Sequence, residues 1–265
     1  MSRFENIEFG GAPRRKAATA RVEADTRGAA HFREKGIEAW LAGDFERALR
    51  LFSRCLEQDA AFFDGWFGQV RMLLELGEFK EALLWSDKAL ELFPEHPTLI
   101  AAKAVAACRT GETDKALAYS DHAIGKRGAG SYVWLSRAEV LLARGSPTGE
   151  HCVRNAVSLY GADSPSVVLE AGRLLRRSKR WKEALSYFRR VADELPDSAL
   201  FWLEAGRCQA ALGMRDAESS LERCLTLRPA WLQADAALSR FRRRGFLKRI
   251  RDRIRRLFGR EHANQ

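Results

Sequence analysis

Cysteine and histidine are the side chains of this sequence that could ligate a metal or act as nucleophiles, and they are scattered. A zinc site needs three or four ligands at close spacing, and only His151 and Cys152 stand side by side. No two cysteines form a CxxC pair, and their odd number and wide spacing are typical of reduced thiols in a cytosolic protein. They are Cys55, Cys108, Cys152, Cys208 and Cys224. We therefore expect no metal, no other cofactor and a cytoplasmic location.

Catalytic motifs are not found in the sequence either. The chain contains no glycine-rich phosphate-binding loop, no GxSxG nucleophile turn and no HExxH metal motif. No apolar run reaches the roughly 18 residues that a membrane-spanning helix needs. Acids stand near the N-terminus, where a secretory signal would be apolar. We expect a protein that is not an enzyme, not a transmembrane protein and not exported.

The formal net charge of +10 is concentrated at the C-terminal end. Residues 29–239 carry 28 Lys and Arg against 29 Asp and Glu, whereas residues 240–265 carry 11 against two. A protein that binds nucleic acid with its whole fold would spread the positive charge over that fold. The C-terminal segment therefore needs an explanation of its own.

Residues 245–265 are predicted to contain a basic amphipathic helix. One helical face is apolar and carries Phe246, Leu247, Ile250, Ile254, Leu257 and Phe258. The other face is basic and carries Lys248, Arg249, Arg251, Arg253, Arg255, Arg256 and Arg260. Such a helix is typical of proteins that lie on an anionic membrane surface. It could also fold back as a second cap, dock on a partner protein or bind nucleic acid, although a phosphate binder has no use for the apolar stripe.

The elements that would position these side chains follow a repeat of 34 residues. Glycines keep this step at Gly43, Gly77, Gly111 and Gly145, and alanines keep it at Ala48, Ala82 and Ala116. The surrounding sequence, for example Gly77-Glu-Phe-Lys-Glu-Ala-Leu83, predicts a helix, a short turn and a second helix. Glycine suits the left-handed end of the first helix, and the acid suits the start of the second. Prolines are expected to close the second helices, at Pro94, Pro196 and Pro229.

This pattern resembles the tetratricopeptide repeat family. The second repeat carries the resemblance most fully, through Trp66, Gly77, Phe79, Ala82, Ala89 and Pro94. The fourth repeat departs from it, because Gly145-Ser-Pro-Thr-Gly149 replaces the usual turn. The resemblance implies an all-α fold, a right-handed α-solenoid of about six helix-turn-helix units. Stacking is required because one such unit cannot bury its apolar face alone.

The repeat divides the chain into an N-terminal arm, six repeats, a capping helix and the basic C-terminal helix. The arm, residues 1–28, is expected to be partly flexible, although Phe4, Ile7 and Phe9 could dock on a partner or pack on the first repeat. The boundaries are 1–28 for the arm, 29–62, 63–96, 97–130, 131–164, 165–198 and 199–229 for the repeats, 230–244 for the cap and 245–265 for the basic helix and tail.

The resemblance also implies a concave groove, lined by the first helix of each repeat, that holds a peptide or a partner helix. Carried over position by position, the groove would be lined by Arg33, Ile37, Trp40, Phe67, Arg71, Leu74, Arg109, Tyr132, Leu135, Arg173, Arg176, Arg177 and Arg207. Aromatic residues and arginines are enriched at binding hot spots, and a segment with apolar anchors and some acids would complement this groove. Alternatively, the arginines are solvated surface side chains, and Trp40 and Phe67 belong to the core if they are buried.

These features together predict a non-enzymatic scaffold or adaptor that binds a protein or peptide partner. The C-terminal residues Phe246, Leu247, Lys248, Arg249, Ile250, Arg253, Ile254, Arg256, Leu257 and Phe258 would attach it to an anionic surface, the inner face of a membrane. The alternative is a regulatory or nucleic-acid-associated factor that acts through the arginine-rich tail. Nucleic acid is the less favoured partner.

Overall fold

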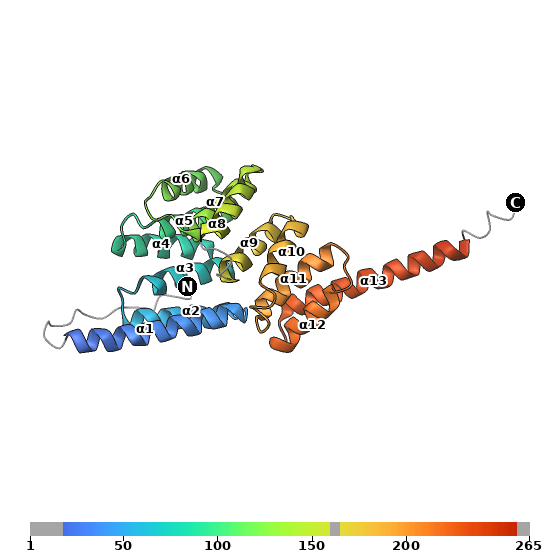
Figure 1. The fold of residues 1–265 in the computed structure, drawn as a ribbon, viewed down its shortest axis with the longest axis horizontal. Coiled ribbons are helices and arrows are strands. Elements are labelled where there is room, and N and C mark those ends of the chain that lie inside the picture. The colour runs from blue at the N-terminus through green and yellow to red at the C-terminus, as the bar shows by residue number, and fades with distance from the viewer. Residues whose placement is uncertain (1–17, 160–164, 259–265) are drawn as a thin grey trace. The chain divides into compact units, whose positions relative to one another are not determined.

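The computed structural model describes residues 18–159 and 165–258, with the side chains of residues 28–159 and 165–245. Within these ranges the chain forms thirteen helices and no strand (Figure 1). The helices belong to two compact units. Unit 1 comprises residues 1–40 and 44–152, and unit 2 comprises residues 41–43 and 153–265. The predicted all-α fold is confirmed, and the paired, stacked helices are those of an α-solenoid.

Unit 1 is built from successive pairs of antiparallel helices. From α2 to α7, helices that are adjacent in the sequence pack together: α3 lies against α2 and α4, and α5 lies against α4, α6 and α7. The helices are α1 (Ala18–Leu41), α2 (Phe45–Gln58), α3 (Phe63–Leu76), α4 (Phe79–Leu92), α5 (Pro97–Arg109), α6 (Thr113–Ile124), α7 (Ser131–Ala143) and α8 (Thr148–Leu159), the last of which crosses into unit 2. Odd-numbered helices are therefore the first helices of the repeats.

Unit 2 continues the same order of pairs. Contacts join α9 to α10, α10 to α11, α11 to α12 and α12 to α13. The bounds are α9 (Pro165–Arg177), α10 (Trp181–Arg190), α11 (Ala199–Ala211), α12 (Ala217–Leu227) and α13 (Leu232–Phe258). No helix in the described part of the chain is long and apolar enough to cross a bilayer.

The turns within the repeats use the left-handed backbone that the glycines predict. Gly77 has a φ of 84°, Gly111 of 88° and Gly145 of 75°, a region that costs a residue with a side chain about 1–2 kcal/mol. In the fifth repeat the same position is occupied by Lys179, which still adopts a φ of 61°. The turn geometry is therefore imposed by the packing of the two helices and not by glycine alone.

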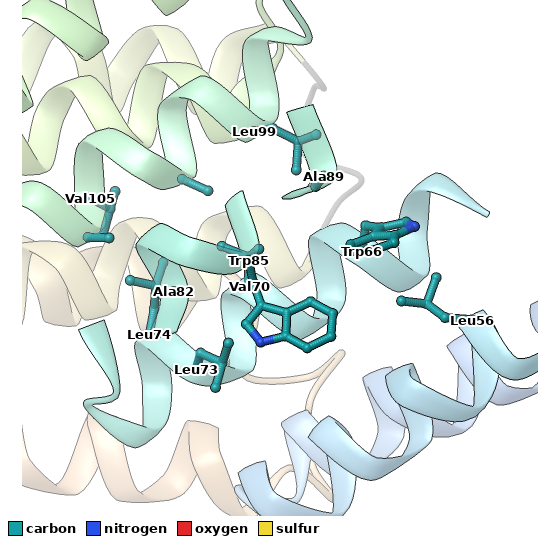
Figure 2. Close-up of a cluster of buried hydrophobic side chains, with 12 residues drawn as sticks. Leu56, Trp66, Val70, Leu73, Leu74, Ala82, Trp85, Ala89, Leu99 and Val105 are labelled. Carbon is teal, nitrogen blue, oxygen red and sulfur yellow. The ribbon is translucent and has the colours of Figure 1, made fainter. Parts of the chain in front are cut away.

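The best defined core of unit 1 joins four helices (Figure 2). It includes Leu56 from α2, Trp66 and Leu73 from α3, Trp85 from α4 and Leu99 from α5. The two indole rings lie with their centroids 5.5 Å apart. Burial of each of these large side chains contributes about 2 kcal/mol. No single helix pair could supply this core, which explains why neighbouring repeats must stack.

Close approach of the two helices in a repeat depends on a glycine opposite an aromatic ring. A Cβ on Gly36 would lie 2.9 Å from the Phe52 ring, and one on Gly172 would lie 2.4 Å from the Phe188 ring. Gly36 and Phe52 belong to α1 and α2, whereas Gly172 and Phe188 belong to α9 and α10. Both units therefore use the same contact between a ring and a bare backbone.

The structure differs from the sequence-based expectations at two helices, α13 and α10, and it contains the helix α8 of the fourth repeat. One helix, α13, runs from Leu232 to Phe258 through Gly245, where a boundary between cap and tail was expected. The α8 helix forms despite its unusual turn, because Pro147 stands just before its first residue, where proline is tolerated. The expectation for Pro196 is wrong, since α10 already ends at Arg190. Phe4, Ile7 and Phe9 lie outside the described residues.

Candidate interaction surfaces

An aromatic and arginine cluster lies on the first helices of unit 1. It consists of Trp40 from α1, Phe67 and Arg71 from α3, and Tyr132 from α7, and it is called the unit 1 cluster below. The Arg71 Cζ atom lies 4.9 Å from the Trp40 ring centroid, 5.4 Å from that of Phe67 and 5.9 Å from that of Tyr132. The Phe67 and Tyr132 rings meet edge to face with centroids 4.7 Å apart. The guanidinium group therefore faces three aromatic rings.

Local sequence explains why the rings meet. Phe67 and Arg71 are four residues apart and share one face of α3. On α5, the positions one repeat later hold Ala101 and Val105, whose small side chains leave room above that helix. Tyr132 of α7 can therefore reach Phe67 of α3, although α5 lies between the two helices in the sequence.

The members of the unit 1 cluster differ in their exposure to solvent. Trp40 is 2% exposed and belongs to the core, so it supports Arg71 from beneath and offers no surface to a partner. Phe67, Arg71 and Tyr132 are half-buried. Partly desolvated cation–π contacts contribute about 1 kcal/mol each, so the Arg71 side chain is held in one place with part of its surface accessible.

Arg109 connects three of the first helices of unit 1 through hydrogen bonds. Its Nε donates to Glu139 Oε1 at 2.7 Å, and its two terminal nitrogens donate to Glu139 Oε2 at 3.2 Å and to the Leu74 carbonyl at 2.9 Å. The side chains of Arg109 and Glu139 are 18% and 15% exposed. This forked ion pair joins α5 to α7 and both to the end of α3. Its hydrogen bonds point to a structural role.

Other predicted groove residues of unit 1 also fall into distinct environments. Leu74 and Leu135 are buried, so the expectation that they line a groove is wrong for this structure. They were selected because the helical period places them on the first-helix face, but neighbouring helices cover them. Arg33 is half-buried and its Nε lies 2.7 Å from Asp64, and Ile37 is half-buried.

A second group of arginines surrounds one buried acid in unit 2. Glu204 of α11 has a side chain that is 3% exposed; its carboxylate lies 3.5 Å from Arg173 Nε and contacts Arg176, both on α9. Arg207, one turn further along α11, donates to the Gln233 side-chain oxygen of α13 at 3.3 Å. We call Arg173, Arg176, Arg207 and Arg240 the unit 2 arginine cluster. Arg173 is buried, whereas Arg177 is exposed.

Positive and negative charges do not balance around the Arg207 guanidinium. Burial, together with the positive charges of Arg176 and Arg240, lowers the pKa of the Arg207 guanidinium, and Glu204 opposes that shift. Two like charges and one opposite charge therefore act on it. The cluster is richer in positive charge than its own carboxylate can neutralise.

Sequence reasoning identified the arginines but missed their acidic partners. Glu139 and Glu204 are the acids that order Arg109, Arg173 and Arg176. A usable signal was present, because each acid stands 28 to 31 residues after its arginine, on the next first helix. This separation is about one helical turn short of the 34-residue period, so pairing of first-helix positions at that separation could have found both acids.

The first part of α13 is fixed on α12. Arg242 donates to Glu218 at 2.7 Å and to Glu222 at 2.5 Å. Trp231 and Leu238 are buried. The side chains from Phe246 onward lie outside the described residues, so the predicted apolar and basic faces of the C-terminal segment stay predictions.

The cysteine thiols and the possible metal ligands were compared with what reactive thiols and metal sites require, within the described part of the chain. Burial raises the pKa of the thiols to about 11 for Cys55, Cys108 and Cys224 and to about 12 for Cys208, which keeps them protonated and weakly reactive. Among the described residues no group of three His, Cys, Asp or Glu side chains is placed to hold a metal ion.

Comparison with known sequences identifies related proteins. The family model described as tetratricopeptide repeat matches residues 33–97 and 169–216. An uncharacterized protein of Methanocaldococcus jannaschii is 31% identical over 61 residues, which are 23% of this chain and 71% of that protein.

Comparison with solved structures gives the same fold. A tetratricopeptide repeat protein from Parabacteroides merdae has a TM-score of 0.50 at 15% identity and covers 83% of this chain and 88% of its own. The human IFIT1 dimer with PPP-AAAA has a TM-score of 0.54 at 18% identity, with 82% and 64% covered. The APC/C heterotetramer Cut9–Hcn1 has a TM-score of 0.53 at 16% identity, with 84% and 44% covered. At these identities the likeness is one of fold alone.

Proposed function

Because the chain belongs to the tetratricopeptide repeat family, we propose that it is a non-enzymatic scaffold that holds a partner polypeptide against the first helices of its repeats. The fold is that of a protein–protein interaction scaffold, whose stacked helices supply long surfaces. The fold does not name the partner. Any closer statement has to come from the side chains on the first helices.

The unit 1 cluster is the observation that supports this proposal most directly. Half-buried Phe67, Arg71 and Tyr132 combine aromatic surface with a guanidinium whose position is fixed by three rings. Residues of these types dominate binding hot spots, because they bury large areas with little loss of side-chain entropy. An apolar or aromatic side chain of the partner would lie against Phe67 and Tyr132, and Arg71 would face its backbone or an acid.

Site-specific photo-cross-linking tests this proposal. A photoreactive phenylalanine analogue at position 37, on the first helix α1, is expected to cross-link a polypeptide partner in cells. The same analogue at Leu84, which is 54% exposed on the second helix α4, is the matched control and is expected not to capture that partner. Mass spectrometry of the cross-linked peptide identifies the bound segment.

The variant Tyr132→Ser connects the captured partner to the unit 1 cluster. Loss of a hot-spot ring typically costs about 1.4 kcal/mol or more, so we expect at least about a tenfold fall in cross-linked yield at position 37. Equal capture at positions 37 and 84, or a yield that Tyr132→Ser leaves unchanged, would contradict the proposal. A circular dichroism spectrum of the variant confirms that its helices are retained.

We also propose that the C-terminal half of α13 attaches the scaffold to an anionic membrane surface. Residues 246–258 continue the helix beyond Arg242, which is the last residue of α13 with an ion pair to α12 among the described side chains. The sequence of this segment combines six large apolar residues with a basic remainder. Each basic residue contributes about 1 kcal/mol near an anionic leaflet, so reversible attachment is expected.

Flotation with liposomes tests the attachment. The full chain is expected to float with vesicles that contain phosphatidylserine, whereas a chain that ends at Arg244 keeps the Arg242 ion pairs and is expected to stay behind. The variant Ile250→Asp with Leu257→Asp preserves the arginines and removes the apolar face, so it separates insertion from charge attraction. Flotation of all three proteins to the same extent rejects the attachment. Salt-sensitive retention of the full chain on RNA without flotation would favour the nucleic-acid alternative.

A further inference from the structure

The unit 2 arginine cluster has more binding capacity than the protein itself uses. Among the described residues, the acceptor that hydrogen-bonds to Arg207 is the neutral oxygen of Gln233, at 3.3 Å, although a guanidinium group has five N–H donors. The buried acid of the cluster, Glu204, is already engaged by Arg173 and Arg176. An incoming anion would therefore meet donors that no internal carboxylate occupies.

The surroundings of Arg207 favour an anion over a neutral ligand. Arg207 is half-buried and hydrogen-bonds Gln233 of α13; burial lowers its pKa, and Arg176 and Arg240 lower it further, against the opposing charge of Glu204. An anion placed among the three arginines offsets their mutual repulsion, and it does so in a partly buried site where Coulomb interactions are stronger than in water. Folding has already brought the three arginines together against their mutual repulsion, so binding of an anion does not require further work to assemble the site.

We propose that Arg176, Arg207 and Arg240 form an acid-binding subsite that holds Asp or Glu side chains of the partner polypeptide. The proposal rests on the proposed scaffold function and names the chemistry that unit 2 recognises. Arg207 is half-buried at the centre, Arg176 lies on α9 and Arg240 on α13. Three helices therefore contribute one donor group each.

The internal acid Glu204 indicates that a carboxylate is the class of anion that the cluster binds. Glu204 is a carboxylate that Arg173 and Arg176 already hold between α9 and α11, so a second carboxylate repeats chemistry that the site performs. A single-stranded nucleic acid would also need aromatic faces on which bases stack. Unit 2 does contain partly exposed rings, among them Trp202 and Phe241, so single-stranded RNA is included as an outcome of the test, and the carboxylate of Glu204 is the observation that favours an acidic polypeptide. A polypeptide rich in Asp and Glu is thus the better match.

Fluorescence anisotropy with the full chain tests the subsite. The probe is a labelled peptide of about twelve residues that alternates Glu with Ala, and its comparison peptide has Gln in place of Glu, both at about 150 mM salt so that distant charges are screened. Arg207→Gln is expected to weaken binding of the Glu peptide about tenfold, which corresponds to the loss of a charge-assisted hydrogen bond. The Gln peptide is expected not to bind measurably.

Two further variants distinguish binding at the subsite from a general effect of net charge and from a loss of folding. Arg189→Gln removes the same charge from an exposed position of the second helix α10, and it is expected to change the affinity by less than about twofold. Arg240→Gln lies on the exposed surface of α13, where the substitution leaves the packing intact, and it is expected to weaken binding about fivefold. The basic C-terminal residues are present in every variant, so their contribution cancels.

Three results would overturn the subsite. They are equal losses for Arg207→Gln, Arg240→Gln and Arg189→Gln, no measurable binding of the Glu peptide, and tighter binding of single-stranded RNA that is lost with Arg207→Gln. Cross-linking from position 37 distinguishes this failure from failure of the scaffold function. If the partner is still cross-linked at position 37 while Arg207→Gln leaves the peptide affinity unchanged, the scaffold function is retained and the subsite is rejected.

Discussion

At the scale of the residue, the turn at Lys179 shows how the fold can override local preference. Gly43, Gly77, Gly111 and Gly145 adopt positive φ angles without steric cost, and Lys179 adopts the same conformation with a side chain. The helices on either side of this turn, α9 and α10, pack through Gly172 and Phe188. That contact fixes the path of the chain and stabilises the strained residue.

Replacement of Lys179 by glycine is expected to stabilise the protein. The variant removes the strain of the left-handed backbone, and the greater freedom of glycine in the unfolded chain takes back part of the gain, so we expect a net increase of about 0.5–1 kcal/mol in the free energy of unfolding. Urea denaturation followed by circular dichroism measures it. The converse variant is Gly77→Ala, which meets no atom within 4 Å and should lose about 1 kcal/mol from backbone strain alone. A loss on Lys179→Gly would show that the lysine side chain matters more than its φ angle.

His96 gives unit 1 a dependence on pH. Its ring lies 4.1 Å, centroid to centroid, from Phe63, and its Nδ1 is buried without a hydrogen-bond partner among the described residues. Burial lowers the pKa of His96 below its ordinary value of 6.5. The unfolded chain therefore takes up a proton at a higher pH than the folded chain does. The stability that His96 contributes is fully present above pH 6.5 and is lost as the pH falls through the folded pKa.

The variant His96→Phe is expected to reduce the loss of stability on acidification, because it keeps the ring contact and removes the titration. Urea melts at about pH 7 and about pH 5, compared between the natural chain and the variant, measure the effect. His151 is exposed, and His151→Phe serves as the control that should leave the difference unchanged. An equal loss in the natural chain and in His96→Phe would exclude His96 as the source.

At the scale of the element, ion pairs between successive first helices set how the helices lie against one another. Arg109 links α5 to α7 through Glu139 and reaches the carbonyl of Leu74 on α3. Glu204 does the same between α9 and α11. Such pairs contribute little net stability when intact, yet removal of one partner leaves a poorly solvated charge behind.

The variant Glu139→Gln is expected to lower the free energy of unfolding by about 2 kcal/mol, since Arg109 then loses its hydrogen-bonded counterion and keeps only the weaker attraction of Glu75. Replacement of both residues by leucine should cost less than about 1 kcal/mol, because neither member of the ion pair is then left without the other. Denaturant melts of Arg109→Leu, Glu139→Leu and the double variant complete a thermodynamic cycle. Losses that simply add would mean that the 2.7 Å contact contributes no coupling.

At the scale of the whole molecule, the chain is divided into two compact units. Each unit contains buried cysteines, among them Cys55 in unit 1 and Cys208 in unit 2. Burial raises the pKa of these thiols to about 11 and about 12, so each reacts only when its surroundings open. Alkylation rates at the two thiols therefore report the opening of the two units separately.

The variant Leu73→Ala removes a fully buried side chain from the core of unit 1 (Figure 2). Such a cavity costs about 3 kcal/mol, and alkylation of Cys55 should accelerate about 100-fold. The rate at Cys208 should stay within about twofold of the natural chain, because stability in a repeat array is passed only between neighbours. Mass spectrometry of quenched samples gives both rates. Equal acceleration at both thiols would mean that the two units open as one cooperative body.

Much of the fold could be read from the sequence because its information is local and periodic. A glycine every 34 residues, with an alanine five residues later, is a property of each repeat alone. It predicts the helix pair, the turn and the need to stack. The end of α10 before Pro196 and the passage of α13 through Gly245 could not be read in this way. Helix ends depend on contacts with neighbouring elements as much as on the residues that usually terminate helices.

The sequence by itself determined the α-solenoid, the left-handed turns and the separate character of the basic C-terminal segment, since each follows from spacing and charge along the chain. Only the tertiary structure decided which first-helix residues are surface and which are core. It buried Trp40, Leu74 and Leu135, paired Arg109 with Glu139 and placed Arg207 under the combined influence of Glu204, Arg176 and Arg240. Helical period gives the direction of a side chain from its own axis, but its burial and its charge partners depend on the helices that pack beside it.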